Sequence, residues 1–552
     1  MTLARGTTAS SRQARHPAAS SPRAGAPDEL TRNALAVLQP GFTGTSAPDW
    51  LLRRLGEGLA AVGLFGRNIA SPEQLAALTG RLRAERPEVL VAIDEEGGDV
   101  TRLEARRGSS FPGNLALGAV DDPALTRAVA HELGRRLAAC GVNLNWAPSA
   151  DVNSNPANPV IGVRSFGAEP DLVARHTAAY VEGLQSAGVA ACTKHFPGHG
   201  DTNVDSHHDL PRIGAGLDTL YARELPPFRA AVAAGTKAVM SAHILLPALD
   251  PDHPATLSSS ALGGLLRAPV SEGGLGFDGL IVTDGMEMRA ISATYGIERG
   301  SVLAVAAGAD ALCVGGGLAD EATVLRLRDA LVTAVREGGL DEERLADAAR
   351  RVRELAVWTL AAAPGTDGSP AERAAGLASS PEVGLAAARR ALTVTARETY
   401  EPLTAPPYVA AFTPVTNIAV GEETPWGVAA ELARLLPGTG TGTYDSASAN
   451  SASVGKTSAN AASGDGLPAV IAHVLQQAAD RRIVAVVRDV HRHPWMASAL
   501  DSLLAARPDT VVVEMGVPQA PPTGALHIAT HGAARVCGRA AAEVITGKNA
   551  GR

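Results

Sequence analysis

Histidines and carboxylates crowd into the segment between Lys194 and Pro211, which reads Lys-His-Phe-Pro-Gly-His-Gly-Asp-Thr-Asn-Val-Asp-Ser-His-His-Asp-Leu-Pro. Within it Asp205 stands two residues before His207, and a carboxylate at that spacing can hydrogen-bond the ring, fix its tautomer and raise its basicity. Such a histidine titrates near neutral pH, which suits a group that first donates a proton and then removes one. The same side chains also suit a divalent cation, so ligand chemistry alone leaves a metal site open.

A second set of chemically useful side chains stands directly after apolar runs that predict β-strands. Asp284 follows Gly279–Thr283, where a carboxylate can either cap a helix or trap the oxocarbenium-like state of glycosidic cleavage as a covalent glycosyl-enzyme. Lys194 and His195 follow Val189–Thr193, and a cation beside an imidazole suits the binding of hydroxyl groups. The other polar side chains at such ends are Asp94, Asp151 and His243.

The elements that must position these residues alternate along the chain. From about Asn33 to Ala363, short β-rich runs alternate with long amphipathic helices, which is typical of a parallel sheet with crossover helices. The predicted strands are Ala34–Leu38, Ala61–Phe65, Val89–Ile93, Val142–Trp146, Val189–Thr193, Ala238–Ser241, Gly279–Thr283 and Ala311–Val314. Eight strands over about 330 residues favour a closed (β/α)8 barrel, in which active residues gather where strands end.

Two of the intervening helices have clear end signals. One begins at Asp121-Asp122-Pro123, with an acidic N-cap and an early proline, and stops at Gly141. The other begins near Glu169-Pro170-Asp171 and ends at Gly188.

The rest of the chain predicts a tail, a linker and a second unit. We expect residues 1–28 to be a disordered tail, 29–363 the (β/α)8 barrel, 364–384 a linker, and 385–552 a smaller C-terminal α/β sandwich domain. The strands predicted in that second unit are Val409–Phe412, Ile418–Val420, Ile483–Val487 and Val511–Val513, with a long flexible loop over Gly438–Gly466.

Composition excludes several classes of protein. A net charge of −8 argues against a nucleic-acid partner. The four cysteines are far apart and form no C-x-x-C pair, so we expect no disulfide framework or zinc site. Three of them lie in apolar stretches, where we expect buried free thiols. Residues 1–28 lack the apolar core of a secretory signal, and no run approaches the roughly 20 apolar residues of a membrane span. We therefore expect a cytoplasmic protein with no membrane partner.

Taken together, the motifs resemble those of bacterial family 3 glycoside hydrolases that act as β-N-acetylglucosaminidases and recycle peptidoglycan fragments. They occur in order at Ile93–Gly98 with Arg102, Asp151–Pro156, Ile161–Gly167, Lys194–Pro211 and Val282–Asp284. The resemblance implies that Asp284 is the nucleophile and that His207 is the acid/base, assisted by Asp205. It also implies that the sugar is bound without metal or cofactor by Asp94, Arg102, Arg164, Lys194 and His195.

Two further expectations concern the mobile and C-terminal parts. Because the loop that carries His207 is rich in Gly and Pro, we expect it to close over bound sugar and bring the imidazole to the glycosidic oxygen. The C-terminal half resembles the α/β sandwich that follows the barrel in many family 3 enzymes, and we interpret it as a stabilising domain. Its segment Arg488–His491 follows a predicted strand and is a candidate to face the mouth of the barrel.

Three residues depart from the family pattern. Family members usually have Gln at the position of Glu95 and often Arg at that of Asp99, so both changes add negative charge beside Asp94. We expect this charge to weaken sugar binding or to raise the pKa of a nearby carboxyl. Arg289 stands where a small residue is common.

The favoured function is a retaining exo-β-N-acetylglucosaminidase whose substrate is a small carbohydrate, either a peptidoglycan-derived muropeptide or a chitin fragment. A phosphorylase that transfers the sugar from the same site to phosphate remains open. So do a sugar-binding homologue that has lost catalysis, motivated by Glu95, Asp99 and Arg289, and a metal-dependent hydrolase.

Overall fold

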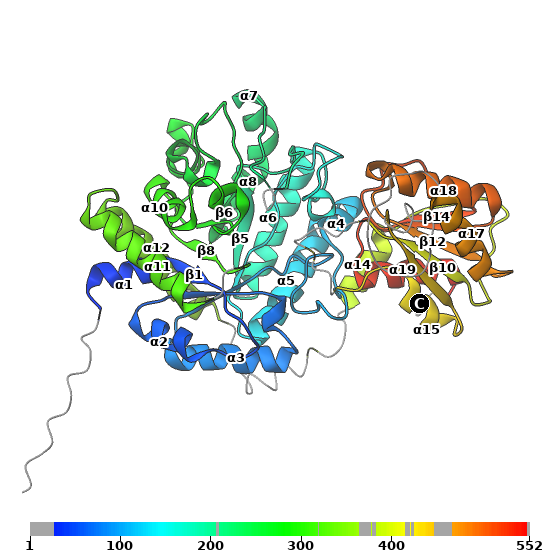
Figure 1. Cartoon of the computed structure of the whole chain (residues 1–552), viewed down its shortest axis with the longest axis horizontal. Helices are drawn as coiled ribbons and strands as arrows, with labels where there is room; N and C mark the ends of the chain where they lie inside the picture. Colours follow the sequence, from blue (N-terminus) through cyan, green and yellow to red (C-terminus); the bar gives the residue numbers. More distant parts are fainter. Residues whose placement is uncertain are drawn as a thin grey trace, which may run out of the picture.

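The computed structural model describes residues 27–205, 209–317, 320–363, 377, 382–414, 420, 424–446 and 466–548. Its elements form an N-terminal region (residues 27–363) and a C-terminal region (residues 382–548), each built on parallel strands. Figure 1 shows the two regions side by side, the first in blue to green and the second in yellow to red. One large apolar core fills the N-terminal region, and two smaller cores lie on the C-terminal sheet.

The described residues of the N-terminal region contain eight parallel strands. They are β1 (Leu38–Pro40), β2 (Ala61–Leu64), β3 (Leu90–Ile93), β4 (Leu144–Asn145), β5 (Ala190–Phe196), β6 (Ala238–Ser241), β7 (Leu280–Thr283) and β8 (Leu312–Val314). Strands β2 to β7 pair in chain order, and β1 pairs with β8. Backbone hydrogen bonds from Thr283 to Ala311 (2.9 Å) and from Ala311 to Ile281 (3.0 Å) connect β7 to β8. Within residues 27–363 as described, no ladder joins β1 to β2, so the closed barrel stays a prediction.

Helices connect these strands and cover the sheet. They are α1 (Glu29–Ala36), α2 (Asp49–Glu57), α3 (Pro72–Glu85), α4 (Asn114–Val120), α5 (Pro123–Ala139), α6 (Pro170–Ser186), α7 (Leu217–Thr219), α8 (Leu225–Ala233), α9 (Arg289–Ser292), α10 (Ile297–Ala307), α11 (Glu321–Arg336) and α12 (Glu342–Ala362). Short 3-10 or π turns occupy Gly66–Asn68, Gly162–Arg164 (η2), Leu220–Glu224, Ala255–Leu257, Ser260–Arg267 and Val270–Glu272.

Helices α5 and α6 confirm the end signals in the sequence. Asp122 caps α5 by accepting hydrogen bonds from the backbone amides of Ala124 and Leu125, both at 3.1 Å. The helix ends just before Gly141, whose φ of +77° suits glycine. The two helices pack against each other.

The predicted strand Ala34–Leu38 is wrong except at its last residue. Residues up to Ala36 belong to α1, whose N-cap Asp28 accepts a hydrogen bond from the Thr31 amide at 2.8 Å, and the strand begins only at Leu38. A short apolar run cannot by itself distinguish the buried end of a helix from a buried strand.

The C-terminal region contains β9 (Thr393–Ala396), β10 (Tyr408–Phe412), β11 (Gly440–Tyr444), β12 (Ile483–Val487), β13 (Val511–Glu514) and β14 (Leu526–Ala529). Their order in the sheet is β11-β10-β12-β13-β14-β9, and only β9 is antiparallel to its neighbour. The helices are α14 (Glu382–Ala391), α15 (Ala429–Leu435), α17 (Gly466–Ala478), α18 (Pro494–Ala506) and α19 (Arg535–Thr546), with a 3-10 turn at Val490–Arg492.

Three strand predictions for this region are confirmed, at β10, β12 and β13. The predicted strand Ile418–Val420 falls outside the described residues except for Val420, and most of the predicted loop Gly438–Gly466 also falls outside them. The start of that loop was predicted wrongly, because Gly440–Tyr444 forms β11 beside β10. The Gly and Thr residues of this segment are typical of a loop, but it forms a strand because it pairs with Tyr408–Phe412.

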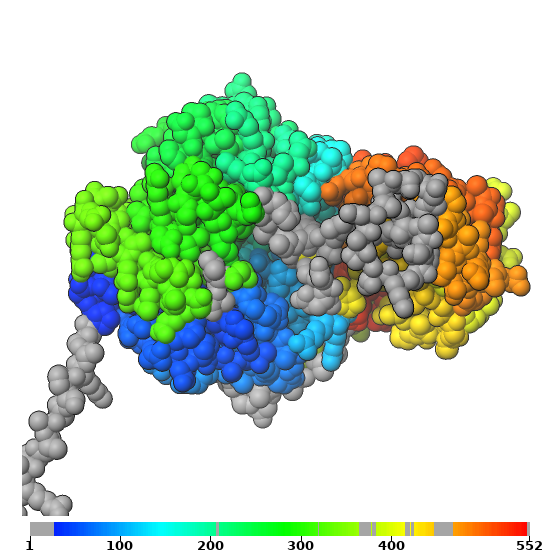
Figure 2. All heavy atoms as spheres, in the orientation of Figure 1, coloured from blue at the N-terminus to red at the C-terminus, as the bar shows by residue number. Residues whose placement is uncertain are grey.

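The two regions are in contact, and Figure 2 shows cyan atoms of the N-terminal region next to orange atoms of the C-terminal region. Helix α14 packs against α4 and α5 of the N-terminal region and against α19 of its own region. His491 Nε2 lies 2.8 Å from the Pro156 carbonyl oxygen, and Arg535 donates to Ser110 Oγ at 2.8 Å. All four cysteines are buried free thiols, including the three predicted to be so. No helix among the described residues is long and apolar enough to cross a membrane.

Candidate active site

The carboxyl ends of β3, β4, β5 and β7 position most of the residues singled out in the sequence. Asp94 follows β3, Asp151 follows β4 after a short extension, and Asp284 follows β7. Lys194 and His195 lie within β5 rather than after it, because that strand extends to Phe196, which corrects the predicted end at Thr193. Since parallel strands end on one edge, these side chains converge.

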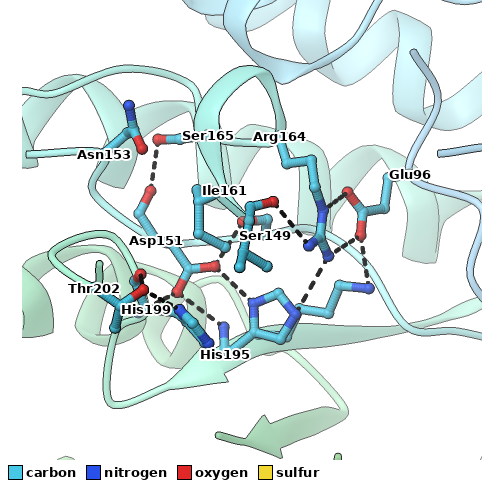
Figure 3. Close-up of polar contacts among 12 residues, drawn as sticks. Glu96, Ser149, Asp151, Asn153, Ile161, Arg164, Ser165, His195, His199 and Thr202 are labelled. Carbon is cyan, nitrogen blue, oxygen red and sulfur yellow. Dashed lines mark hydrogen bonds and ion pairs between the residues drawn. The ribbon is translucent and has the colours of Figure 1, made fainter. Parts of the chain in front are cut away.

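Glu96 is the centre of a buried cluster of charges at this edge (Figure 3). Its carboxylate accepts hydrogen bonds from Arg164 Nε (3.0 Å) and Nη2 (2.7 Å), and it lies 2.7 Å from Lys194 Nζ. Lys194 also donates to Asp94 Oδ1 at 2.6 Å. The other three side chains are buried, whereas 23% of the Asp94 side chain is exposed. The cluster thus presents a reachable carboxylate held by a fixed cation, which suits a ligand rich in hydroxyl groups.

The electrostatics of the cluster keep it ionised. Burial alone would raise the pKa of Glu96, but the charges of Arg164 and Lys194 hold it well below its usual range. Burial likewise lowers the pKa of Lys194, yet the carboxylates of Asp94 and Glu96 raise it above its usual value. At neutral pH the ionised Glu96 therefore faces the two cations in a largely dry site.

Asp151 orients the ring of His195 (Figure 3). Its Oδ2 lies 2.7 Å from His195 Nδ1, while its Oδ1 accepts the backbone amides of His195 (3.2 Å) and His199 (2.7 Å). Arg164 Nη2 lies 3.3 Å from His195 Nε2, and a guanidinium can only donate. Nε2 therefore accepts, and the ring proton resides on Nδ1, which donates to Asp151. The carboxylate fixes both the tautomer and the direction of the ring.

The first half of the loop after β5 is anchored rather than free. His199 Nδ1 lies 2.8 Å from Thr202 Oγ1, and Asn158 Nδ2 donates to the His199 carbonyl oxygen at 2.9 Å. Gly200 approaches the backbone of Val152 so closely that a Cβ there would lie 1.7 Å from its carbonyl oxygen. Only glycine fits at this position, so the loops after β4 and β5 pack as one unit.

Asp284 lies at the same edge as this network. Its amide donates to the Ser241 carbonyl oxygen at 3.1 Å, and its Oδ1 accepts the Gly285 amide at 2.8 Å. Burial lowers the pKa of His199 to about 4, and the negative charge of Asp284 is near enough to act against that shift. The helix-cap interpretation of Asp284 is wrong, because the next helix, α9, has Met288 as its N-cap.

Three further predicted site residues are Arg102, Asp205 and His207. Arg102 is half-buried on the loop after β3, and its backbone amide donates to Glu95 Oε2 at 2.7 Å. Asp205 is half-buried, and its carbonyl oxygen accepts the Asp209 amide at 3.1 Å. His207 lies outside the described residues.

The departures from the family pattern do not act beside Asp94 as expected. Glu95 points away from it, and its Oε2 accepts the amides of Arg102 (2.7 Å) and Leu103 (2.8 Å). The carboxyl whose pKa is raised is its own, to about 7, because it is buried. Asp99 pairs with Arg488 of the C-terminal region at 2.5 Å and accepts the Ala533 amide at 2.7 Å.

Two residues of the site had no role in the sequence interpretation. Glu96 belongs to the motif Ile93–Gly98, and Asp151 was noted at a strand end, but neither was assigned a function. A signal existed for Asp151, since it follows a predicted strand after a short extension, much as Asp94 and Asp284 directly follow theirs. Glu96 offered no such signal, because only the fold brings Arg164 and Lys194 to it.

A cavity of about 730 Å³ lies between the two regions and adjoins the charged cluster. Arg164 and Asp205 belong to its walls, as do residues of the C-terminal region such as Arg488 and Trp426. Asp94, Lys194 and Asp284 do not line it, so the cavity extends from the site rather than containing it.

Comparison with known proteins agrees with this geometry. Residues 52–355 match the model of the "Glycosyl hydrolase family 3 N terminal domain". The chain belongs to glycosyl hydrolase family 3. The matched residues contain every strand of the N-terminal region except β1, together with the charged cluster, Asp151, His195 and Asp284.

Relatives of this family 3 chain carry a consistent description. It is 34% identical over 341 residues to beta-hexosaminidase A of Pseudoalteromonas piscicida, a match that covers 56% of each chain. It is 39% identical over 253 residues to a beta-hexosaminidase of Alkalilimnicola ehrlichii, covering 45% of this chain and 71% of that one. A solved family 3 beta-N-acetylglucosaminidase from Paenibacillus sp. is 35% identical, with a TM-score of 0.79 over 95% of this chain and 97% of the other.

Proposed function

We propose that this family 3 protein is a retaining exo-β-N-acetylglucosaminidase. The observation that carries the proposal is the Asp94–Lys194–Glu96–Arg164 cluster, which forms a rigid polar site at the same strand ends as Asp284. The printed descriptions of the relatives support the N-acetylhexosamine class. The proposed substrate is a terminal β-linked N-acetylglucosamine on a muropeptide or a chitin fragment.

In this proposal the charged cluster binds the terminal sugar. Asp94 accepts hydroxyl hydrogens, while Arg164, Lys194 and Arg102 donate to hydroxyl or acetamido oxygens. His195, held by Asp151, keeps a fixed ring at the wall of the site. Because the cluster is rigid and mostly dry, it is already organised when the sugar arrives.

The proposed chemistry uses Asp284 and His207 in two steps. A carboxylate oxygen of Asp284 attacks the anomeric carbon while His207 gives its proton to the glycosidic oxygen, and the bond to the leaving group breaks. A water molecule then attacks the anomeric carbon and gives a proton to His207, and the ester bond to Asp284 breaks. Asp205 assists by holding the imidazole. Two inversions release the sugar with its original anomeric configuration.

The proposal is tested with an aryl β-N-acetylglucosaminide. We expect wild type to release the aryl alcohol and Asp284→Ala to lose at least about 1,000-fold in kcat, because the glycosyl-enzyme cannot form. Asp278→Asn is the matched control, since Asp278 precedes the same strand and is 93% exposed. An inactive wild type, or a fully active Asp284→Ala, refutes the assignment. Product analysis with added phosphate distinguishes free N-acetylglucosamine from its 1-phosphate.

The role of His207 is tested through the leaving group. We expect His207→Ala to lose much less activity on an aryl glycoside with an acidic leaving group than on a natural disaccharide, because the acidic group departs without protonation. Equal losses on the two substrates would show that His207 is not the acid.

We also propose that residues 29–363 and 385–552 act as separate domains.

A further inference from the structure

The cavity between the two regions is walled by loops from both sheets. The N-terminal region contributes loops that follow β3 and β4, which carry Asp99 and Arg164. The C-terminal region contributes Thr413, directly after β10, and Arg488 and Arg492, after β12. Both parallel sheets therefore direct their carboxyl ends toward the same space.

The C-terminal sheet reverses its strand order at this cavity. The chain passes from β10 to β11 on one side and then returns to β12 on the other side of β10. In open parallel sheets, ligands bind outside the carboxyl ends of the strands at such a reversal. Thr413 and Arg488 stand at that point, and the volume of about 730 Å³ falls within the range of small-molecule sites.

We infer that this cavity binds the aglycone of the substrate and that the aglycone carries a carboxylate recognised by Arg492. The inference rests on the proposed function, since an exo-enzyme holds one terminal sugar at the catalytic site and must place the remainder elsewhere. The cavity shares Arg164 with the sugar-binding cluster and Asp205 with the proposed acid/base pair. A leaving group attached to a sugar in that cluster therefore extends into the cavity.

The charges of the cavity favour an anion at Arg492. Of its three arginines, Arg164 is held by Glu96 through two hydrogen bonds, and Arg488 lies 2.5 Å from Asp99. Arg492 has no such partner among the described residues: its side chain makes no hydrogen bond, and its one ion pair, with Asp489, is 3.9 Å long. With 22% of its side chain exposed, its guanidinium is half-buried and available to a carboxylate.

The carboxylates of the cavity are already engaged. Asp489 Oδ1 accepts the Val517 amide at 2.7 Å, and Asp99 is bound by Arg488 and by the Ala533 amide. Asp205 is the proposed partner of His207. A ligand carboxylate at Arg492 therefore does not displace a short ion pair.

The remaining walls suit the body of a sugar. Trp426 is half-buried in the wall, beside apolar residues that include Pro159 and Ile161. A large aromatic side chain offers a flat apolar face with a polar edge, which matches the apolar face of a pyranose ring. The occupant with the best fit is thus a second sugar ring that bears an acidic substituent.

The test compares two disaccharides that differ in this substituent: N-acetylglucosaminyl-β-1,4-N-acetylmuramic acid and neutral diacetylchitobiose. We expect wild type to favour the first in kcat/KM, and Arg492→Gln to lower the ratio of the two values by about tenfold through KM, the size of one charge-assisted hydrogen bond. Arg492→Lys should restore part of the ratio. Trp426→Ala should raise KM for both disaccharides.

Arg434→Gln is the control, since Arg434 is an exposed arginine of the same region that pairs only with Glu431 among the described residues. Its ratio should equal that of wild type. An unchanged ratio in Arg492→Gln overturns the proposal. Calorimetric titration with free N-acetylmuramic acid separates this failure from a failure of the proposed function, because binding needs no catalysis. Weaker binding to Arg492→Gln than to wild type supports the cavity site, and equal binding overturns it.

Discussion

Replacing Glu96 by glutamine is the sharpest test of the charged cluster. The substitution keeps the size of the side chain but removes the charge that two buried cations, Arg164 and Lys194, share at 2.7 Å each. An amide oxygen in place of Oε1 can keep two of the three contacts, but the amide nitrogen that replaces Oε2 is itself a donor and repels Arg164 Nε. Breaking a buried ion pair by removing one partner costs about 3–5 kcal/mol of stability.

The matched control is Glu321→Gln. The Glu321 carboxylate also accepts hydrogen bonds from two arginines, from Arg54 Nε at 3.0 Å and from Arg53 Nη2 at 3.3 Å. In contrast to Glu96, 27% of its side chain is exposed. An exposed carboxylate of this kind contributes about 1 kcal/mol or less. The comparison therefore isolates the effect of burial from that of the number of partners.

Both variants are unfolded in urea and followed by tryptophan fluorescence at pH 7, and their kcat/KM is measured on the aryl glycoside. We expect Glu96→Gln to unfold at clearly lower urea than wild type and to lose about 100-fold in kcat/KM, since misplaced ligand-binding groups cost on that order. Glu321→Gln should resemble wild type in both. Equal destabilisation by the two substitutions would refute the reasoning from burial.

The pH dependence of stability is a second test that compares wild type with Glu96→Gln. Because the pKa of Glu96 is held below its ordinary value of 4.5, its stabilisation is fully present above that value and is lost as pH falls through the lowered pKa. The difference in the free energy of unfolding between wild type and Glu96→Gln should therefore stay constant near neutral pH and become smaller in acid. A difference that becomes larger in acid would contradict the assignment of a negative charge to Glu96.

Three further predictions follow from the same contacts. Asp151→Asn should reduce kcat/KM by about 100-fold, with circular dichroism unchanged, because His195 loses the carboxylate that fixes its ring; activity near that of wild type would count against this role. Glu95→Gln should stabilise the protein above pH 7 by at most on the order of 3 kcal/mol, because the pKa of Glu95 is raised to about 7 and its ionisation there costs stability. That gain, measured by thermal unfolding, should vanish below about pH 4.5, and a gain independent of pH would exclude titration as its cause. Asp99→Asn should lower the unfolding temperature and speed proteolysis between the two regions, since it leaves Arg488 without its partner at a cost of about 3 kcal/mol; unchanged proteolysis would show that the contact does not hold the regions together.

The sequence predicted the parallel α/β class and most members of the candidate site because both depend on local patterns. Alternating apolar runs and amphipathic helices predicted seven of the eight N-terminal strands closely, and Asp94, Lys194 and Asp284 were found because polar residues at strand ends are easy to see. The errors arose where local patterns are ambiguous. The run at Ala34 ends a helix, and Gly440–Tyr444 is a strand only because β10 lies beside it.

The prediction about Glu95 and Asp99 failed for a different reason. Adjacency in the chain suggested that both act on Asp94, but the side chains of a loop point in different directions. Glu95 bonds the backbone of its own loop, and Asp99 reaches the C-terminal region. The role of that region as a stabilising unit stays a prediction, but the structure adds that Arg488 and Arg492 line a cavity that adjoins Arg164.

By itself, then, the sequence determined which side chains stand at the ends of parallel strands, because hydrophobic periodicity and chain order fix the elements and their direction. Only the tertiary structure decided which of these side chains are partners. Glu96 meets Arg164 across 68 residues, Asp151 meets His195 across 44, and Asp99 meets Ala533 across 434. Such pairs depend on the packing of the loops and of the two regions, and the spacing of residues along the chain carries no record of it.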